Sequence, residues 1–503
     1  MPLPDELFLD GWPTGRGGIR VAVVYPNSYS VGMASLGYQT VLREIFEIGG
    51  CEIRRFFFDP AKGIVAPDGG SPAEADLMLV SIAYELDYIN FVRLLISGGM
   101  NPRRFENAGL PLILAGGVAP SANPWPLSNI ADAVHIGDCE DALPGYISTI
   151  NEYIKDLRGP NFADARSTLL YEWQIGGNAL IPYPSQREGE TADVKWAEYA
   201  DFGSNPGYSI VITPDSVWGD AFLAETSRGC EVGCKFCLIG NNQGNCRHAS
   251  FDVLHSLIER YVPQAGSVGL IGSSVGSYPH LLDLVRLCND MRKRVGLSSL
   301  SIRNAPDELF ALMAASGEHK VTMAVETGSE LLQKDIGKII PAGLVTDRVK
   351  AAYDAGLQAV KLYFVIGLPG EGRAEVGESI NLVRDVAEQV NLSSRKGKAE
   401  LDVGLSCFVP KRGTPWEHHP MAPERELRKR IDMFREGVKD IRYVSVQAES
   451  PELSAIQGVL SIGDKSLSEA IIASAVNGDA WRGEFKRFAR ISGWFEHIQE
   501  MRE

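Results

Sequence analysis

The sequence is poor in positive charge and has no long hydrophobic run. Its 503 residues contain 49 Lys and Arg against 64 Asp and Glu, which gives a formal net charge of −15. A broad nucleic-acid-binding surface needs a basic footprint, so this balance argues against one. No apolar run reaches the length that spans a bilayer, and residues 1–6 lack the basic and apolar segments of a signal peptide. We therefore expect a cytoplasmic protein that contacts no membrane.

Cysteine is too sparse for a disulfide scaffold. The chain holds eight cysteines in 503 residues, whereas small disulfide-stabilised domains are far richer in them. Four of the eight fall between residues 230 and 246. That clustering indicates a metal or cofactor site rather than scattered structural thiols.

Residues 1–160 alternate short apolar runs with amphipathic segments, which is typical of a doubly wound α/β domain. The first run, residues 19–25, predicts a strand, and residues 36–48 have helical spacing. The further strands that we expect are 52–58, 76–82, 111–115 and 132–136. Near-continuous apolar strands favour a parallel sheet covered on both faces, so we expect a Rossmann-like, flavodoxin-like domain. An irregular connector over residues 161–212, with a polar stretch at 183–191, should follow it.

A second strand–helix series predicts a partial (β/α)6 barrel over residues 213–415. Active sites of such barrels lie at the carboxyl ends of the strands. Residues 416–503 carry apolar side chains at helical spacing and predict a mainly helical C-terminal domain. The six expected barrel strands are 221–226, 267–271, 300–303, 320–325, 359–364 and 401–408.

Cys230, Cys234 and Cys237 form a CxxxCxxC motif directly after the first expected strand of this barrel. A [4Fe–4S] cluster normally takes four thiolates, so three cysteines in one tight loop leave one iron open to a chelating ligand. Two glycines within the motif allow the loop to wrap closely. The alternative is a zinc site, which Cys246 and His248 just downstream could complete.

The motif and residues 221–415 around it resemble the core of the radical S-adenosylmethionine (SAM) superfamily. The resemblance implies that the three cysteines bind the cluster, that Phe236 lies against the adenine of SAM and that Glu326 binds its ribose. It also implies an adenine-binding turn at residues 365–371, which contains Gly367. Residues 269–276 depart from the family pattern, which leaves Ser273 and Ser274 as candidates for the amine contact. Other strand-end candidates, for which packing or ion pairing is the alternative role, are Ser301, Arg303, Lys361 and Tyr363.

A flavodoxin-like domain in front of such a barrel resembles the cobalamin-binding radical SAM enzymes. The resemblance implies that a corrin lies at the carboxyl ends of the N-terminal strands, where glycines allow a flat ligand to approach the backbone. The first histidine of the chain, His135, lies inside an apolar run, so we expect no histidine from the first loop below the cobalt. The candidate cobalamin-binding residues are Asn27, Ser28, Tyr29, Met33, Ser81, Tyr84, Gly116, Gly117, Val118, Gly137 and Asp138.

Together these resemblances imply a cobalamin-dependent radical SAM C-methyltransferase. In that family a 5′-deoxyadenosyl radical made from SAM removes hydrogen from an unactivated carbon, and methylcobalamin supplies the methyl group. The implied cofactors are a [4Fe–4S] cluster, SAM and cobalamin, with a ferredoxin or flavodoxin as electron donor. We expect a peptide or protein substrate, because the tail shows no RNA-binding module. The arrangement resembles the branch that methylates a glutamine of methyl-coenzyme M reductase.

Two other functions are open, one that uses the same cofactors and one that uses none of them. An enzyme of the same architecture could catalyse a cyclisation or a rearrangement, which the mass of the product would distinguish from methylation. A zinc-stabilised binding protein would hold no cofactor in its N-terminal domain and would lack iron–sulfur absorbance. The sequence identifies no catalytic side chain for any of the three.

Overall fold

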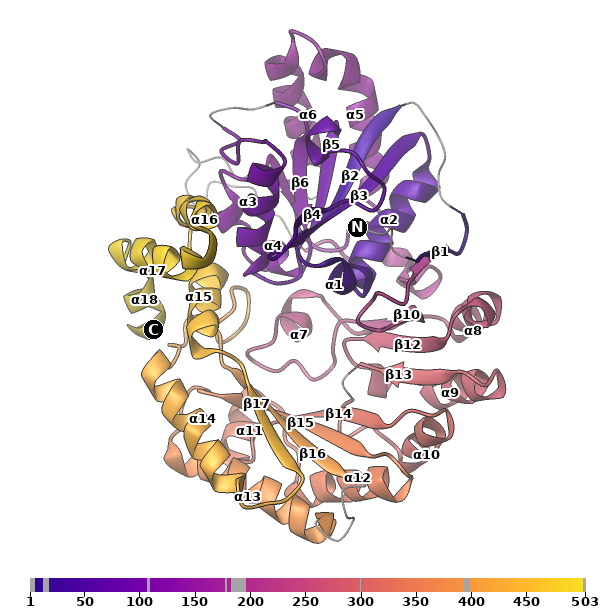
Figure 1. The fold of residues 1–503 in the computed structure, drawn as a ribbon, viewed down its shortest axis with the longest axis vertical. Helices are drawn as coiled ribbons and strands as arrows, with labels where there is room; N and C mark the ends of the chain where they lie inside the picture. The colour runs from indigo at the N-terminus through magenta and orange to yellow at the C-terminus, as the bar shows by residue number, and fades with distance from the viewer. Residues whose placement is uncertain are drawn as a thin grey trace. The chain divides into compact units, whose positions relative to one another are not determined.

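The computed structural model describes residues 5–11, 18–105, 109–176, 179–181, 196–298, 300–392 and 399–500. The polar stretch at 183–191 lies outside the described residues. The chain divides into two compact units, which Figure 1 colours by position in the sequence. Unit 1 comprises Met1–Ala200, Gly207–Asp220 and Val459–Glu496, and unit 2 comprises Asp201–Pro206, Ala221–Gly458 and His497–Glu503.

Unit 1 is built on a seven-stranded sheet of order β4-β3-β2-β5-β6-β7-β8. Its five central strands are parallel, and in chain order they follow the 2-1-3-4-5 arrangement of flavodoxin-like folds. The edge strands β4 and β8 run antiparallel to their neighbours. The strands are β2 (Ile19–Tyr25), β3 (Cys51–Asp59), β4 (Gly63–Val65), β5 (Leu77–Ser81), β6 (Leu112–Gly116), β7 (Ala133–His135) and β8 (Ala179–Leu180), beside the small pair β1 (Leu7–Phe8) and β9 (Val211–Ile212).

Both faces of this sheet are buried, as the near-continuous apolar strands indicate. Val21 and Val23 of β2 belong to one core together with residues of α2, α5 and α6. Ala22 and Val24 point to the opposite face and are fully buried as well. The helices of unit 1 are α1 (Tyr29–Met33), α2 (Leu36–Ile48), α3 (Asp87–Ser97), α4 (Val118–Ala122), α5 (Leu143–Leu157), α6 (Phe162–Gly176), α16 (Leu467–Val476) and α17 (Trp481–Ile491).

The unit boundaries differ from the expected domain limits at 160, 212 and 415. Helix α6 and strand β8, which fall in the expected connector, belong to unit 1. One reason is a buried charge: the Asp132 carboxylate is fully buried and binds Arg166 of α6 at 2.6 Å and Arg104 at 3.0 Å. Because an unpaired buried carboxylate is costly, Asp132 requires α6 to pack against the sheet.

Unit 2 contains two four-stranded sheets, of order β11-β10-β12-β13 and β14-β15-β16-β17. A single parallel bridge between Leu300 and Met323 joins the end of the first sheet to the second, which completes a partial barrel. All pairs except β10 with β11 are parallel. The strands are β10 (Ala221–Arg228), β11 (Arg247–His248), β12 (Ser267–Gly272), β13 (Arg294–Leu297), β14 (Lys320–Glu326), β15 (Ala359–Ile366), β16 (Glu400–Cys407) and β17 (Val444–Ala448).

Helices separate the parallel strands of unit 2, as the barrel expectation requires. They are α7 (Leu238–Asn242), α8 (Phe251–Tyr261), α9 (Leu281–Asp290), α10 (Asp307–Ala315), α11 (Glu330–Ile336), α12 (Ala342–Asp354), α13 (Arg373–Gln389) and α14 (Glu424–Val438). The expected third strand at 300–303 is wrong, because the strand is Arg294–Leu297 and residues 302–304 form a turn. In β13 the apolar residues Val295 and Leu297 alternate with Arg294 and Gly296, so the strand has no continuous apolar run for a sequence pattern to detect.

Residues 416–503 do not form a separate helical domain. Strand β17 extends the second barrel sheet by pairing with β16, and α14 packs on α13. The helices α15 (Pro451–Ile462) and α18 (Trp494–Glu500) each cross a boundary between the units, and α16 packs against α3 of unit 1. The C-terminal region is thus divided between the two units.

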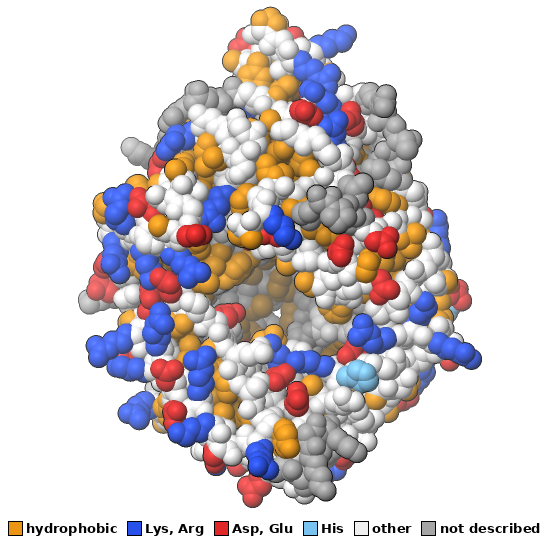
Figure 2. All heavy atoms as spheres, in the orientation of Figure 1, with side chains coloured by type: hydrophobic (Ala, Val, Ile, Leu, Met, Phe, Trp, Pro, Cys, Tyr) orange, Lys and Arg blue, Asp and Glu red, His pale blue; other side chains and the backbone are white. Residues whose placement is uncertain are grey.

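No helix among the described residues is both long and apolar enough to cross a membrane. On the face drawn in Figure 2, Lys and Arg side chains are interspersed with Asp and Glu side chains.

Two glycines at the carboxyl edge of unit 1 are required by the backbone itself. Gly117 has φ +109° and Gly137 has φ +102°, both in the region that L side chains rarely adopt. A Cβ at Gly117 would clash with the carbonyl of Ile82, and one at Gly137 would clash with the backbone of Ala197. Gly116 differs, since its Cβ would make only ordinary contacts, 3.8 Å from the Cβ and 3.9 Å from the carbonyl oxygen of His135.

We predict that Gly117→Ala destabilises the protein by about 1–3 kcal/mol, the usual cost of one strained backbone position. Gly116→Ala should leave the thermal unfolding temperature unchanged, because the added methyl group makes an ordinary van der Waals contact. Thermal unfolding of the two variants without ligands checks both expectations. Equal melting temperatures for Gly117→Ala and the wild type would contradict the prediction.

Candidate active site

The cysteine motif lies in a closed loop at the carboxyl end of β10. Strand β11 returns to β10 in antiparallel register, with Ser227 opposite His248 and Arg228 opposite Arg247. The intervening residues 229–246 therefore leave the sheet and come back to it at one point. This places the three cysteines at the end of the barrel where active sites of this architecture lie.

Glycines permit the tight folding of this loop. Gly229 has φ +80°, and a Cβ there would lie 2.7 Å from the carbonyl oxygen of Asn245. Gly233 has φ +61°, and a Cβ on Gly240 would lie 2.9 Å from the Cα of Gly233. The first contact closes the stem of the loop and the second packs its two arms together, so larger residues would force the loop open.

The three thiols of the motif are free and half-buried, and the loop backbone is held around them. The side-chain amide of Asn241 donates to the carbonyl oxygens of Cys234 at 2.9 Å and Cys237 at 2.7 Å. Burial raises the pKa of the Cys234 thiol to about 12, which a bound cation would counteract. Burial also raises the pKa of Cys237, while the amides of Ile239 and Gly240 lower it by donating to the sulfur. Free thiols in a glycine-folded loop with N–H donors fit an iron–sulfur cluster.

Phe236 anchors the loop to the other strands of the barrel. Its ring packs against a buried apolar cluster that includes Ile336 and Trp416. The backbone adds two hydrogen bonds, from Lys235 N to Ile336 O and from Trp416 N to Lys235 O, each at 3.1 Å. The residues expected to contact the adenine and the cluster therefore form one connected structure.

Glu326 ends β14 in a strained conformation beside the cysteine loop. Its φ is +70°, which is uncommon outside glycine, and a β-bulge lies between Ala324 and Glu326. Its carboxylate accepts a hydrogen bond from Lys338 Nζ at 2.8 Å, and both side chains are largely buried. Lys338 lowers the pKa of Cys234 and Glu326 raises it, so both charges lie close to the cluster loop. Lys338 was not among the expected residues, because it lies outside every strand end.

The serines after β12 divide into a buried residue and a more accessible one. Ser274 is 6% exposed and its hydroxyl lies 2.8 Å from that of Ser277. Ser273 is exposed and its backbone N–H donates to Ser227 O at 3.4 Å. Among the described residues, the buried Ser227 hydroxyl has no hydrogen-bond partner. Of the two candidates for the amine contact, Ser273 is thus the one whose side chain is not already engaged with another serine.

The structure does not bring all other strand-end candidates together. Arg303 is exposed and its Nε donates to Ile339 O at 2.8 Å, so it links the turn at residues 302–304 to the segment after α11. Lys361 and Tyr363 lie on one face of β15, with Lys361 Nζ 4.7 Å from the centre of the Tyr363 ring. Ser301 is half-buried next to that turn rather than at the end of a strand, because β13 ends earlier than expected.

The glycine-rich turn after β15 is stabilised by its own carboxylate. Gly367 has φ +86°, and its N–H donates to Glu371 Oε1 at 2.8 Å. Burial raises the pKa of Glu371 to about 7, although Arg430 lies 3.1 Å away and lowers it. Arg430 comes from α14, 59 residues further along the chain, so no local sequence pattern predicts this pair.

The unit 1 candidates follow neighbouring parallel strands and therefore share one edge of the sheet. β2 lies beside β5, β5 beside β6 and β6 beside β7. The order reverses between β2 and β5, which is where open α/β sheets bind ligands. The residues at or just after these strand ends are Asn27, Ser28, Ser81, Tyr84, Gly116, Gly117, Val118, Gly137 and Asp138.

Several of these candidates have structural partners in unit 1. Met33 is 2% exposed and belongs to the core, so it does not line the edge of the sheet. Tyr29 packs on the same core and donates its hydroxyl proton to Glu6. The Asp138 carboxylate accepts from Tyr199 N at 3.0 Å. His135 is buried, and its ring nitrogens lie 2.9 Å from the Tyr146 hydroxyl and 2.8 Å from Asp138 O. This histidine is the only one in the sequence of unit 1. It is a core residue, as the sequence indicates.

A buried carboxylate that the sequence pattern did not identify lies at the same edge. Asp87, at the start of α3, is 4% exposed and accepts from Asn27 Nδ2 at 2.9 Å and Asn90 Nδ2 at 3.2 Å. Burial raises its pKa to about 7, with a smaller contribution from Glu85. Asn27 is therefore occupied in binding Asp87, and the pair fixes the turn after β2.

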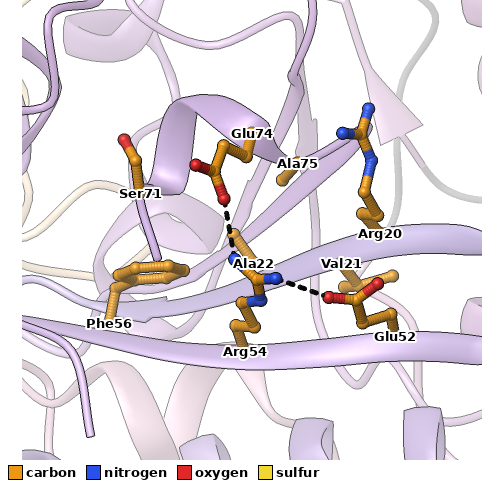
Figure 3. A pocket seen from close by; sticks show the side chains of 9 residues that line it. All are labelled: Arg20, Val21, Ala22, Glu52, Arg54, Phe56, Ser71, Glu74 and Ala75. Carbon is orange, nitrogen blue, oxygen red and sulfur yellow. Dashed lines mark hydrogen bonds and ion pairs between the residues drawn. The ribbon is translucent and has the colours of Figure 1, made fainter. Parts of the chain in front are cut away.

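A small pocket of unit 1 lies away from this edge. Figure 3 shows Arg54 between Glu52 and Glu74, with each carboxylate 2.7 Å from the guanidinium. Arg20 and Glu52 come from the starts of β2 and β3, at the amino end of the sheet. Its charges pair with one another, so we interpret the pocket as a surface ion-pair network.

We predict that Asp87→Asn stabilises the protein at pH 8 and not near pH 4. The raised pKa means that the folded state binds more protons than the unfolded state between about pH 4 and pH 7, so stability falls as pH rises through this range. Asn keeps the acceptor for Asn27 but cannot ionise. The gain at pH 8 should be at most about 4 kcal/mol, since one pKa unit corresponds to about 1.4 kcal/mol.

Urea unfolding at both pH values measures this difference. Asp141→Asn, at an exposed position, serves as the control and should change little at either pH. An equal gain for Asp87→Asn at pH 4 and pH 8 would contradict the assignment.

Two curated relatives align with most of the chain. The uncharacterized protein MJ0966 of Methanocaldococcus jannaschii is 23% identical over 452 residues, which is 90% of each chain. A tRNA-2-methylthio-N(6)-dimethylallyladenosine synthase of Neisseria meningitidis is 19% identical over 411 residues, covering 78% of this chain and 82% of its own length.

Two solved structures share the fold over nearly the whole chain. One is the radical S-adenosylmethionine methyltransferase TsrM of Kitasatospora setae with cobalamin and a [4Fe–4S] cluster bound, at a TM-score of 0.53 and 13% identity, covering 94% of this chain and all of that one. The other is the cobalamin-dependent S-adenosylmethionine radical enzyme OxsB, also at a TM-score of 0.53 and 13% identity, covering 96% of this chain and 76% of that one.

Two family models match the chain, one within unit 1 and one within unit 2. The model of N-terminal regions of radical SAM proteins matches residues 68–169, within unit 1. The model of the radical SAM superfamily matches residues 224–383, from β10 to α13, and so contains the cysteine loop and Glu326. Residues 224–383 thus match the radical SAM superfamily, in a chain that has the fold of cobalamin-dependent radical SAM enzymes.

Proposed function

We propose that the protein is a cobalamin-dependent radical SAM C-methyltransferase that acts on an unactivated carbon of a peptide or protein. The observation that carries the proposal is the closed CxxxCxxC loop at the end of β10, beside the buried pair of Glu326 and Lys338. When bound, a [4Fe–4S] cluster with SAM supplies radical chemistry, and cobalamin supplies methyl transfer.

The chain's own residues would hold and shield these groups. Cys230, Cys234 and Cys237 would ligate three irons and leave the fourth open to the amine and carboxylate of SAM. Asn241 keeps the loop carbonyls of two of these cysteines in place, and Phe236 packs the loop on the apolar cluster that excludes water from its inner side. Lys338 places a cation beside Cys234, where negative charge of the thiolates would otherwise accumulate.

Glu326 would bind the ribose of SAM through its carboxylate. Its hydrogen bond to Lys338 occupies one oxygen, Oε1, which leaves Oε2 and further lone pairs for hydroxyl groups. The positive φ and the bulge direct this single side chain out of the regular strand alternation. Strained residues of this kind persist where the surrounding structure holds them, which supports a functional role.

The carboxyl edge of the unit 1 sheet would take the corrin. The switch point between β2 and β5 lies there, and Gly116 offers open backbone beside it. Both ring nitrogens of His135 have partners, so no imidazole of unit 1 is free to ligate cobalt.

The substrate remains the expectation from sequence, a peptide or protein residue such as the glutamine of methyl-coenzyme M reductase. The test is anaerobic reconstitution with SAM, cobalamin and a reductant, followed by mass spectrometry of candidate peptides. A mass increase of one methyl group supports the proposal, whereas a product of altered connectivity without added mass would favour cyclisation or rearrangement.

We predict about four irons and four sulfides per chain after anaerobic reconstitution. Alanine at Cys230, Cys234 or Cys237 should remove them, because each cysteine supplies one ligand. Cys246→Ala should keep the iron, since Cys246 lies outside the motif. Iron and sulfide analysis of the four variants decides this, and loss of iron in Cys246→Ala alone would contradict the assignment.

We predict that Glu326→Gln weakens SAM binding about ten- to hundred-fold, the loss of a charge-assisted hydrogen-bond pair worth about 1.5–3 kcal/mol. Gln preserves the size of the side chain, so iron content should not change. Equilibrium dialysis with labelled SAM measures the affinity, and Glu378→Gln, exposed on α13, is the control. If Glu326→Gln binds SAM as tightly as the wild type, Glu326 serves only to pair with Lys338.

We predict that reconstituted protein holds cobalamin without a histidine lower ligand. The cob(II)alamin form should lack the nitrogen splitting of an axial imidazole in its electron paramagnetic resonance spectrum. Gly116→Leu should block binding by steric hindrance while unit 1 stays folded, because the glycine tolerates a Cβ. Observing the nitrogen splitting, or retention of cobalamin in Gly116→Leu equal to that of the wild type, would contradict this placement.

A further inference from the structure

We propose that Glu231, Cys246 and His248 form a separate zinc site that joins the two ends of the cysteine loop. The three side chains offer a carboxylate oxygen, a sulfur and an imidazole nitrogen that all lie within 4.8 Å of one another. Oxygen, sulfur and nitrogen ligands together suit Zn²⁺. The site is distinct from the cluster, since none of its three residues belongs to the cysteine triplet of the motif.

The topology brings these residues together from opposite ends of the loop. Glu231 follows the first cluster cysteine, whereas His248 ends the returning strand β11 and pairs with Ser227 in register. A Cβ on Gly229 would lie 2.7 Å from the carbonyl oxygen of Asn245, so the outgoing and returning chains approach closely at this point. A metal bound here would cross-link residues 231 and 246–248 and so fix the stem of the loop.

The distances and partners of the pair Cys246 and His248 favour a metal over a hydrogen bond. Cys246 Sγ lies 3.9 Å from His248 Nε2, which is long for a hydrogen bond. Zinc bonds of about 2.3 Å to sulfur and about 2.1 Å to nitrogen span such a separation at an angle somewhat wider than tetrahedral. Among the described residues, the buried Nδ1 of the same imidazole has no hydrogen-bond partner. His248 is therefore not a core histidine whose nitrogens are both satisfied, unlike His135.

Zinc binding at this site releases one proton and changes no oxidation state. The Cys246 thiol loses its proton to solvent, and Zn²⁺ takes the resulting thiolate, the neutral imidazole and the Glu231 carboxylate. Glu231 is exposed, so the fourth position stays open to water. The net charge of the three ligands is −2, which the metal neutralises next to the negatively charged cluster thiolates.

The experiment measures zinc and iron together on the full chain, reconstituted anaerobically, exposed to one equivalent of zinc sulfate and desalted. We expect about one zinc per chain in addition to the cluster iron. Cys246→Ser and His248→Ala should each lower zinc at least ten-fold and leave the iron of freshly reconstituted protein unchanged. Cys246→His, which restores a zinc ligand, should retain zinc.

Matched controls separate this site from nonspecific binding and from loss of folding. Cys139→Ser and His255→Ala remove a thiol and an imidazole elsewhere and should keep the zinc. With a chelator present, the wild type and the Cys246→Ser variant should unfold at the same temperature, which shows that the variant is folded. A zinc content that is absent in the wild type, or that Cys246→Ser leaves unchanged, would overturn the proposal. So would zinc that rises as iron falls and disappears in Cys234→Ala, because that metal would occupy the cluster cysteines.

Discussion

The closure of one loop on the end of β10 is the constraint on which the rest of the candidate site depends. The pairing of β11 with β10 fixes where the loop leaves and returns, and Gly229 and Gly233 let its arms approach each other. Only then do the backbone of Lys235 and the ring of Phe236 meet the ends of the other barrel strands. A loop of the same cysteine spacing without this closure would present three thiols in no defined geometry.

Two buried ion pairs near the strand ends position residues of the candidate site. Glu326 with Lys338, and Glu371 with Arg430, are largely buried pairs that join the end of a strand, or the turn after it, to another segment of the chain. A buried charge that loses its partner is strongly destabilising, whereas the intact pair adds little net stability. Such pairs are therefore better explained by positioning: Glu371 holds the N–H of Gly367 in the turn, and Lys338 brings a cation to Cys234.

Unit 1 shows how fold and ligand requirements overlap at one sheet edge. Gly117 and Gly137 satisfy the backbone, Asn27 binds Asp87 and Met33 fills the core, so these residues have structural reasons to be what they are. Gly116 lacks such a reason, since its nearest neighbour would tolerate a side chain. Residues whose identity the fold does not explain are the better guide to a ligand, and this criterion needs the structure.

The sequence by itself determined most of the parallel strands of both units, and the exact bounds of Ile19–Tyr25 and Leu36–Ile48, because these segments have a strong apolar pattern. It also determined the cysteine loop, whose spacing is chemically specific. The tertiary structure alone decided the pairs of Glu326 with Lys338 and Asp132 with Arg166, since partners distant in sequence leave no periodic signal. It likewise decided that β13 is Arg294–Leu297 and that β17 extends the barrel, because short strands without a continuous apolar run are defined by their neighbours rather than by their own composition.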